Sequence, residues 1–113
     1  MIAGFEQGEF IKLDFGTSIG YESIGRNLAL VVSSSRFNAA ISGFAVICPI
    51  ITQDNKHPLH VRLKGEVDAE GFVCVEQLRT VDLVRWNAES LYAFISQKTM
   101  SEVLEIIGAV FGI

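Results

Sequence analysis

The chain has 113 residues, of which 50% are apolar and 19% are charged. This length fits a single domain over residues 1–113, and the composition is that of a globular protein, not of a disordered one. The net charge of −4 argues by itself against a nucleic-acid partner, although residues 26–64 carry five basic side chains against one acidic side chain. The first residues lack the pattern of a secretory signal and no apolar run could cross a bilayer, so we expect a cytoplasmic protein without a membrane partner.

Apolar runs separated by polar turns predict a series of short strands. The continuous apolar runs are typical of strands that are buried on both faces. We expect strands at Glu9–Phe15, Leu28–Ser33, Phe44–Ile51, His60–Lys64, Phe72–Gln77 and Leu91–Ser96. Ser33–Ser35 are candidate caps for one short helical turn, and Leu83–Asn87 is a candidate for a second turn.

Residues Thr99–Phe111 predict the one long helix. Thr99 and Glu102 have the spacing of a capping box, which places the start of the helix at Thr99. Apolar residues then recur at helical spacing and form one broad face, which we expect to pack on the sheet or on a partner. The pattern as a whole predicts a mainly β, α+β domain, namely a small SH3-like antiparallel barrel with a C-terminal amphipathic helix.

Residue types that commonly bind metals do not predict a metal site here. His57 and His60 are three residues apart, but Pro58 excludes a regular helix, and this spacing in a strand directs the side chains to opposite faces. Cys48 and Cys74 match neither a zinc pattern nor a redox motif, so we expect buried free thiols. We therefore expect no metal and no cofactor.

Polar side chains gather where the apolar runs end, and they form the candidate site. Because strand ends of a small barrel meet at a rim, such residues can line a binding site. A structural network, with Arg79 paired to Asp82 or Glu22, is an equally good interpretation of the residues alone. The polar residues at strand ends are Glu22, Arg26, Asn27, Thr52, Gln53, Glu76, Gln77, Arg79 and Asp82.

Several short motifs stand in a fixed order along the chain. They are G-x-E at Gly20–Glu22, the Gly25–Arg26 pair, a loose S-x-x-x-F-N match at Ser34–Asn38, C-P-x-x-T-Q at Cys48–Gln53 and E-Q-L-R-T-V-D at Glu76–Asp82. Their order resembles the MazF/PemK/Kid family of toxins from toxin–antitoxin systems. The resemblance runs from about Gly8 to Gly112, and no single motif carries it.

This resemblance implies a compact SH3-like barrel that forms a homodimer and cleaves single-stranded RNA at short sequences. It also implies neutralisation by a cognate antitoxin whose acidic tail lies in the RNA groove. The implied reaction is attack of a ribose 2′-hydroxyl on the adjacent phosphate, which needs no metal but does need a proton acceptor, a proton donor and donors aimed at the phosphorane oxygens.

By the same resemblance, Arg26 and Thr52 are the expected catalytic residues. Arg26 would stabilise the phosphorane through its fork of donors, and Thr52 would donate to the phosphate. The residues expected to bind RNA are Glu22, Asn27, Gln53, Gln77, Arg79 and Asp82.

The chain departs from the family pattern at two positions. Asn27 and Leu28 stand where the family has Arg-Pro, and Ile51 stands where it has threonine or serine. Two alternatives to an RNA-cleaving toxin therefore remain open. One is a gyrase poison like the related CcdB toxins, which end in Trp-Gly-Ile where this chain ends in Phe-Gly-Ile, and the other is a catalytically impaired relative that only binds antitoxin.

Overall fold

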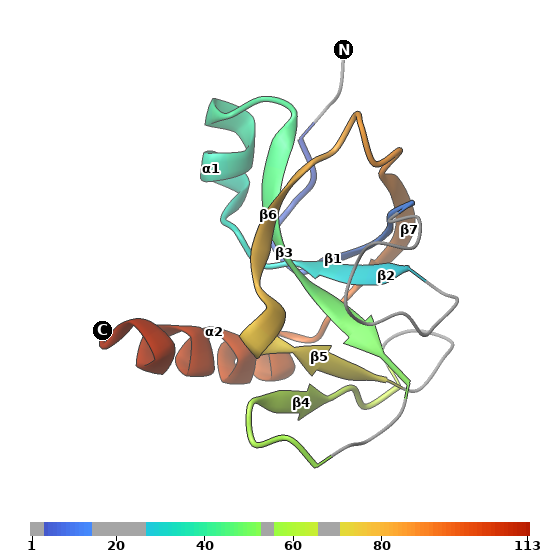
Figure 1. Cartoon of the computed structure of the whole chain (residues 1–113). Coiled ribbons are helices and arrows are strands. Elements are labelled where there is room, and N and C mark those ends of the chain that lie inside the picture. Colours follow the sequence, from blue (N-terminus) through green and yellow to red (C-terminus); the bar gives the residue numbers. More distant parts are fainter. Residues whose placement is uncertain (1–3, 15–26, 53–55, 66–70) are drawn as a thin grey trace.

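The computed structural model describes residues 4–14, 27–52, 56–65 and 71–113, and these form a mainly β domain with one long helix (Figure 1). The mainly β, α+β class predicted from the sequence is confirmed. The elements in chain order are β1 (Glu9–Lys12), β2 (Leu28–Val31), α1 (Ser35–Ala40), β3 (Phe44–Ile51), β4 (His60–Arg62), β5 (Phe72–Cys74), the 3-10 helix η1 (Val75–Gln77), β6 (Arg79–Asp82), β7 (Glu89–Phe94) and α2 (Gln97–Phe111).

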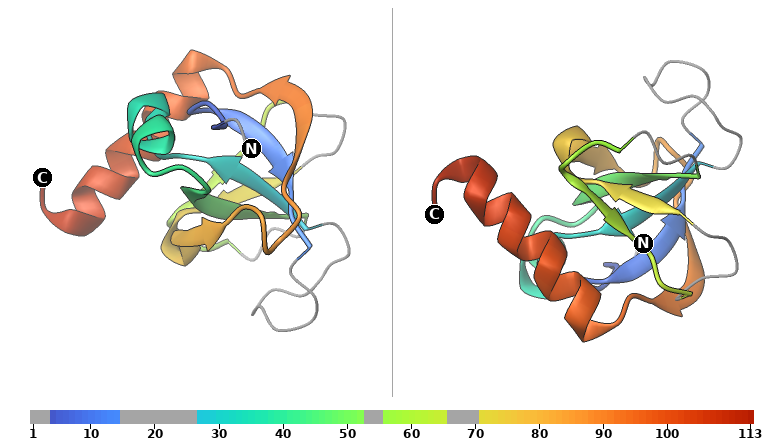
Figure 2. Two further views of the ribbon diagram at one scale, coloured as in Figure 1. Left: turned by 90° about the horizontal axis from the view of Figure 1, so that it is seen from above. Right: turned by 90° about the horizontal axis from the view of Figure 1, so that it is seen from below.

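The described strands pair antiparallel in the order β4-β5-β3-β2-β1-β7, and β6 pairs with β3 beside this path. The sheet is strongly curved and approaches the shape of a barrel (Figures 1 and 2). Within the part of the chain that the structure describes, β4 and β7 remain at the ends of the path and the barrel is not closed.

Each central strand contributes to a core on both of its faces. In β1, Phe10 packs on one side and Ile11 on the other, and both side chains are at most 1% exposed. Leu30 and Cys48 join the Phe10 side, whereas Ala29 and Ile47 join the Ile11 side. Because adjacent residues in a strand point to opposite faces, two cores require continuous apolar runs. The prediction of strands buried on both faces is therefore confirmed.

Strand β3 changes its partner halfway along its length. Its end, Ile50 and Ile51, pairs with β5, whereas its first half, Phe44–Ile47, pairs with β6. The chain crosses between these two pairings as η1, so the predicted strand Phe72–Gln77 is wrong in its last three residues. Strand β6 was not predicted, because its exposed residues Arg79 and Thr80 break any apolar pattern.

The C-terminal helix begins earlier than the capping-box prediction places it. Ser96 is the N-cap, and its Oγ accepts a hydrogen bond from the Thr99 backbone N–H at 3.2 Å. Thr99 is inside the helix and 1% exposed, so the predicted cap at Thr99 is wrong. The predicted short turn is confirmed as α1, which Ser34 caps. Neither described helix is long and apolar enough to cross a membrane.

Candidate functional site

The chain enters β2 through Asn27, whose backbone has φ 44°. Its carbonyl accepts a hydrogen bond from the Leu13 backbone N–H at 2.9 Å, which fixes the residue against the end of β1. Asparagine tolerates this left-handed region better than most residues, and a residue that precedes proline avoids it. The backbone here therefore suits the Asn27–Leu28 pair of this chain.

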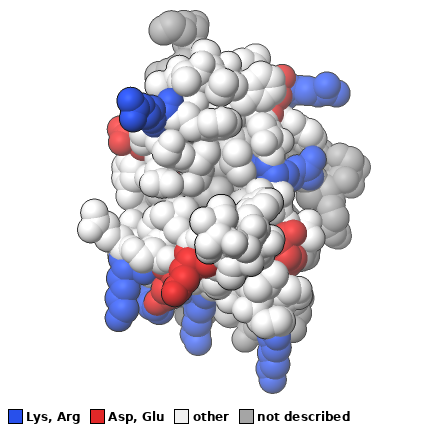
Figure 3. Space-filling view, turned by 90° about the vertical axis from the view of Figure 1, so that its left-hand side faces the viewer, with Lys and Arg blue, Asp and Glu red and all other residues white. Residues whose placement is uncertain are grey.

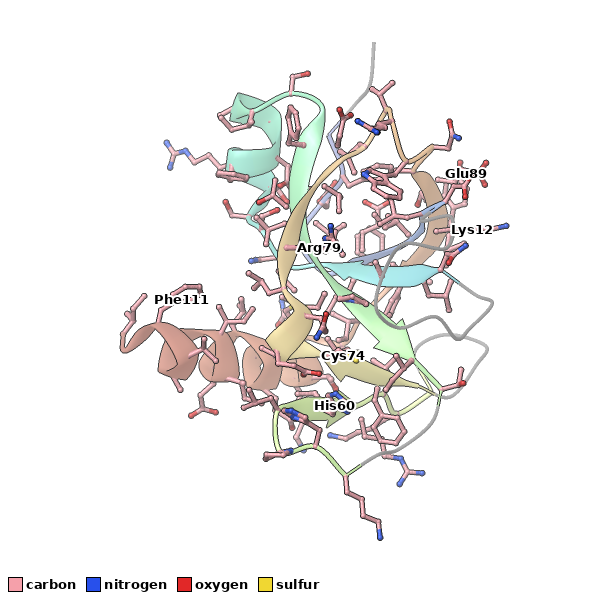
Figure 4. All side chains as sticks on the ribbon, viewed as in Figure 1. Lys12, His60, Cys74, Arg79, Glu89 and Phe111 are labelled. Carbon is pink, nitrogen blue, oxygen red and sulfur yellow. The ribbon has the colours of Figure 1, made fainter. Side chains whose placement is uncertain are left out.

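A polar pocket of about 430 Å³ lies at this end of the sheet. Lys12 pairs with Leu28 on one side and with Glu89 on the other, so the register of β1 brings three strands together at the pocket. Figure 4 shows Lys12 and Glu89 close together at the same end of β1 and β7. The described lining residues are Lys12, Leu13, Asp14, Asn27, Asn87 and Glu89. Of these, the sequence analysis named only Asn27, because strand pairing and not local sequence assembles the others.

Thr52 follows the last residue of β3 and is exposed. The β2–β3 register pairs Ala29 with Pro49, so β3 ends where β2 begins. The structure thus brings the ends that carry Asn27 and Thr52 to the same side of the sheet. The other expected site residues of this group, Glu22, Arg26 and Gln53, lie outside the described residues.

Arg79, expected to bind RNA, lies at the start of β6 and away from the end of β3 that carries Thr52. It is exposed and pairs with Ile47, five residues before Thr52, which corresponds to about 17 Å along a strand. Gln77 and Glu76 lie between these positions on η1. The structure therefore spreads the candidate residues along β3 instead of gathering them around one point.

Asp82 is at the far end of this row, where it pairs with Phe44. Its Oδ1 accepts hydrogen bonds from the Val84 and Arg85 backbone N–H groups, both at 3.1 Å, and so caps the turn before β7. The ion pairs among the described residues do not include an Arg79–Asp82 pair. The structure thus gives Asp82 a role in a turn and does not bring it near Thr52.

Glu76 meets both histidines of the chain. Its Oε2 lies 2.9 Å from His60 Nε2, and its Oε1 lies 4.0 Å from His57 Nδ1. The two imidazole rings stack with their centroids 4.8 Å apart. The predicted strand start at His60 is confirmed, and His57 belongs to the preceding turn. The argument that the spacing of three separates the two side chains applied to a continuous strand, and the turn brings them together instead.

Both cysteines are free and buried, as predicted. Burial raises the pKa of the Cys48 thiol from 9.0 to about 12, with further contributions from Cys74 and Glu76. A thiol that stays protonated at neutral pH is a poor nucleophile and a poor metal ligand. Cys48 is thus part of the core and not of the site.

A profile described as PemK-like, MazF-like toxin of type II toxin-antitoxin system matches residues 6–111. The chain belongs to this family. No curated protein sequence matches the chain significantly.

Solved structures of the family have the same fold. MazF from Deinococcus radiodurans is 27% identical, with a TM-score of 0.82 over 97% of this chain and 98% of that one. MazF in a MazE–MazF complex from the same organism is 26% identical, with a TM-score of 0.80 over 97% of each chain. An endoribonuclease from a Mycobacterial species is 17% identical, with a TM-score of 0.76 over 100% of this chain and 95% of that one, and it adds support for the fold.

Proposed function

We propose that this protein is the toxin of a toxin–antitoxin pair and that it cleaves single-stranded RNA without a metal. One structural observation supports the location of the reaction. The start of β2 and the end of β3 meet at one side of the sheet, so Asn27 and Thr52 approach each other there. Arg26 directly precedes Asn27 in the sequence. The family's two motifs are therefore joined by the pairing of two strands.

In the proposed reaction, the 2′-oxygen of one nucleotide attacks the phosphorus of the next phosphodiester. The bond from phosphorus to the 5′-oxygen breaks, which leaves a 2′,3′-cyclic phosphate and a 5′-hydroxyl. The 2′-hydroxyl loses its proton and the departing 5′-oxygen gains one. The Thr52 hydroxyl donates to a non-bridging oxygen, and the Arg26 guanidinium neutralises the charge that develops on the phosphorane.

The remaining candidate residues bind RNA away from the reacting bond. Arg79 is about 17 Å along β3 from Thr52, which is too far for contact with the same phosphate. We propose that Arg79 contacts the backbone of a neighbouring nucleotide and that Gln77 contacts a base between them. RNA lying along β3 would thus explain why the candidate residues form a row.

Thr52→Ala tests this proposal. The purified protein is incubated with a long RNA in EDTA, and the new 5′ ends are mapped by primer extension. We expect discrete cuts whose rate falls at least about 100-fold in Thr52→Ala, as is typical for loss of a donor to an oxyanion. Thr80→Ala is the matched control, because Thr80 is also an exposed threonine, on β6. Equal rates in the two variants would contradict the role of Thr52.

We also propose a homodimer, with the exposed last turn of α2 covered by a second copy. Met100 and Val103 in the first half of α2 are buried against the sheet, whereas Val110 and Phe111 are 54% and 62% exposed. A groove of about 250 Å³ separates this end of the helix from η1. Figure 3 shows that much of this side is uncharged, with acidic side chains in its lower middle and basic side chains mostly toward its edges. Exposed apolar areas mark interaction sites.

The oligomeric state can be measured by size-exclusion chromatography with light scattering. We expect a dimer for the natural sequence and a monomer for Val110→Glu, because a buried carboxylate at the interface would have no partner. Ser101→Glu adds the same charge at an exposed position earlier on α2. A dimer that persists in Val110→Glu would contradict the proposed interface.

The exposed C-terminus is the observation that favours the second candidate function, a gyrase poison. In the single chain, Phe111 is 62% exposed and Ile113 is 96% exposed, so both are accessible to a partner where no second copy covers the end of α2. Inhibition of gyrase that disappears after removal of residues 111–113, in a protein that leaves RNA intact, would favour this function. Inactivity in both assays would favour a relative that only binds antitoxin. For the antitoxin we propose a protein with an acidic tail, matching the basic segment at residues 26–64.

A further inference from the structure

His57, His60 and Glu76 form a cluster of metal-binding side chains outside the proposed catalytic residues. One ligand atom from each residue can be chosen so that all three lie within 4.8 Å of one another. In Figure 4, His60 lies on β4 beneath η1, on the side of the sheet where α2 runs. Two imidazoles and one carboxylate are a common ligand set for zinc and related divalent ions.

The backbone places the two histidines side by side. His57–Pro58–Leu59–His60 forms a tight turn, in which the His60 N–H donates to the His57 carbonyl at 3.0 Å. Proline at the second position of such a turn fixes φ, so the turn is rigid before any ion binds. Because ligands that are already held lose little freedom on binding, this turn favours coordination.

The third ligand comes from a separate element that is fastened to this turn. His60 pairs with Cys74 across β4 and β5, and Glu76 follows two residues later on η1. The Val75 N–H also donates to the Leu59 carbonyl at 3.4 Å. A bound ion would therefore join two segments that are already neighbours.

The ring nitrogens of His57 and His60 differ in what they now contact. His57 Nδ1 accepts a hydrogen bond from the Leu59 N–H at 3.1 Å, so it carries a lone pair and not a proton. Coordination by Nδ1 exchanges this hydrogen bond for a metal–nitrogen bond. His60 Nε2 and Glu76 Oε2 lie 2.9 Å apart, and a metal would replace any proton between them.

Binding an ion requires the ligand atoms to move closer together. Zinc–nitrogen and zinc–oxygen bonds of about 2.0–2.1 Å at tetrahedral angles place neighbouring ligand atoms about 3.3 Å apart. Glu76 Oε2 lies 2.9 Å from His60 and Oε1 lies 4.0 Å from His57, while the set as a whole spans up to 4.8 Å, so the partly exposed His57 ring is the ligand that must shift inward. The His57 side chain is 38% exposed, so an ion can enter from solvent and keep a water as its fourth ligand.

His60 is held in a buried position, with a side chain that is 2% exposed. Its Nδ1 has no hydrogen-bond partner among the described residues. Because the ion would bind Nε2, the nitrogen that faces Glu76, the unsatisfied Nδ1 is not itself a sign of a metal site.

We propose that His57, His60 and Glu76 bind one divalent transition-metal ion, of which zinc is the representative, and that the ion clamps the turn before β4 to η1. Because η1 also carries Gln77 and leads into Arg79, the clamp would fix the segment proposed to hold RNA away from the cleavage point. The metal binding itself does not depend on RNA cleavage, since no ligand is a catalytic residue.

The test uses the full chain, freed of any affinity tag, and titrates it with zinc chloride in a calorimeter. We expect one ion per chain and no binding of magnesium, because imidazole nitrogen favours zinc over magnesium. The melting temperature should rise by about 5 °C or more in excess zinc. Because the chain has only two histidines, paramagnetic cobalt should broaden the imidazole NMR signals of both.

His57→Gln is the variant of choice, because His57 is partly exposed and its loss does not break the buried His60–Glu76 contact. We expect the zinc affinity to fall at least tenfold in His57→Gln and to stay unchanged in Glu105→Gln, which removes an exposed carboxylate on α2. No saturable zinc binding, or equal affinity in His57→Gln and the natural sequence, would overturn the proposal. Either result would leave the RNA-cleavage proposal untouched.

Discussion

Asn27 is the residue at which this chain departs most clearly from the family pattern, and its backbone gives a physical reason. With φ 44°, the residue is in a conformation that asparagine tolerates and that a residue before proline avoids. Asparagine at 27 and a residue other than proline at 28 therefore both fit this backbone conformation. Asn27 also lines the polar pocket, which places its amide beside the expected path of the RNA.

The Cys48 thiol predicts how the free energy of unfolding depends on pH. Its pKa is raised from 9.0 to about 12, mainly by burial, so the neutral thiol is favoured in the folded state. The raised pKa of Cys48 contributes stability that is complete below pH 9 and is lost as the pH rises toward 12. We expect the free energy of unfolding of the natural sequence to fall toward that of Cys48→Ala between pH 8 and 10.5.

Urea denaturation of both proteins at several pH values measures this difference. Other groups that titrate in this range, such as lysine and tyrosine, are present in both proteins and cancel in the comparison. A difference that stays constant from pH 8 to 10.5 would show that the Cys48 thiol is not kept neutral by its surroundings.

The residues of the candidate site could be predicted only in part. Residue types at strand ends, together with the family motifs, point to Thr52 and Asn27, whose strand ends the structure brings to one side of the sheet. The same reasoning did not predict the position of Asp82, because only the turn itself shows that its carboxylate caps Val84 and Arg85. It also failed to bring the two histidines together, because the turn His57–His60 before β4, and not a strand, places their side chains side by side.

At the scale of elements, Asn38 connects α1 to two other parts of the chain. Its side chain is buried, and its Nδ2 donates to the Phe5 carbonyl at 2.8 Å and to the Ser33 carbonyl at 3.2 Å. Its Oδ1 accepts from the Ser33 hydroxyl, which itself accepts from the Val46 N–H at 2.9 Å. This network explains why an asparagine occurs on so short a helix.

We expect Asn38→Ala to reduce the free energy of unfolding by about 2–3 kcal/mol, since it leaves buried groups without partners. Arg36→Ala is the matched control, because Arg36 is exposed on the same helix, and it should change stability by less than about 0.5 kcal/mol. Thermal and urea denaturation give both values. Equal stability of the two variants would contradict the proposed importance of the network.

Local patterns predicted most elements because each carries its own apolar period. The strand β3, for example, has the predicted bounds Phe44–Ile51. The sequence did not predict η1 and β6, because they depend on β3 changing partners and not on their own residues. The cap at Ser96 was missed because Thr99 offered an equally good local pattern, and only packing against the core decides between them.

At the scale of the whole molecule, two cores flank the central strands, and α2 covers only part of one of them. Most of α2 packs on this core, including Ile106 and Ile107, and only its last turn, with Val110 and Phe111, is exposed and extends away from the sheet (Figure 2). The apolar face was predicted to pack on the sheet or on a partner. The core accounts for this face as far as Ile107, and we propose a second copy of the chain for the last turn.

The row of candidate residues along β3 leads us to propose that an RNA strand lies along this side of the sheet and is cut beside Thr52. The chemistry of the ends tests this most directly. Fragments of a long RNA, cut in EDTA, are analysed by mass spectrometry. We predict discrete cuts with a 2′,3′-cyclic phosphate on one side and a 5′-hydroxyl on the other, both absent with Thr52→Ala. Intact RNA, or fragments that end in a 5′-phosphate, would contradict cleavage by 2′-hydroxyl attack at this site.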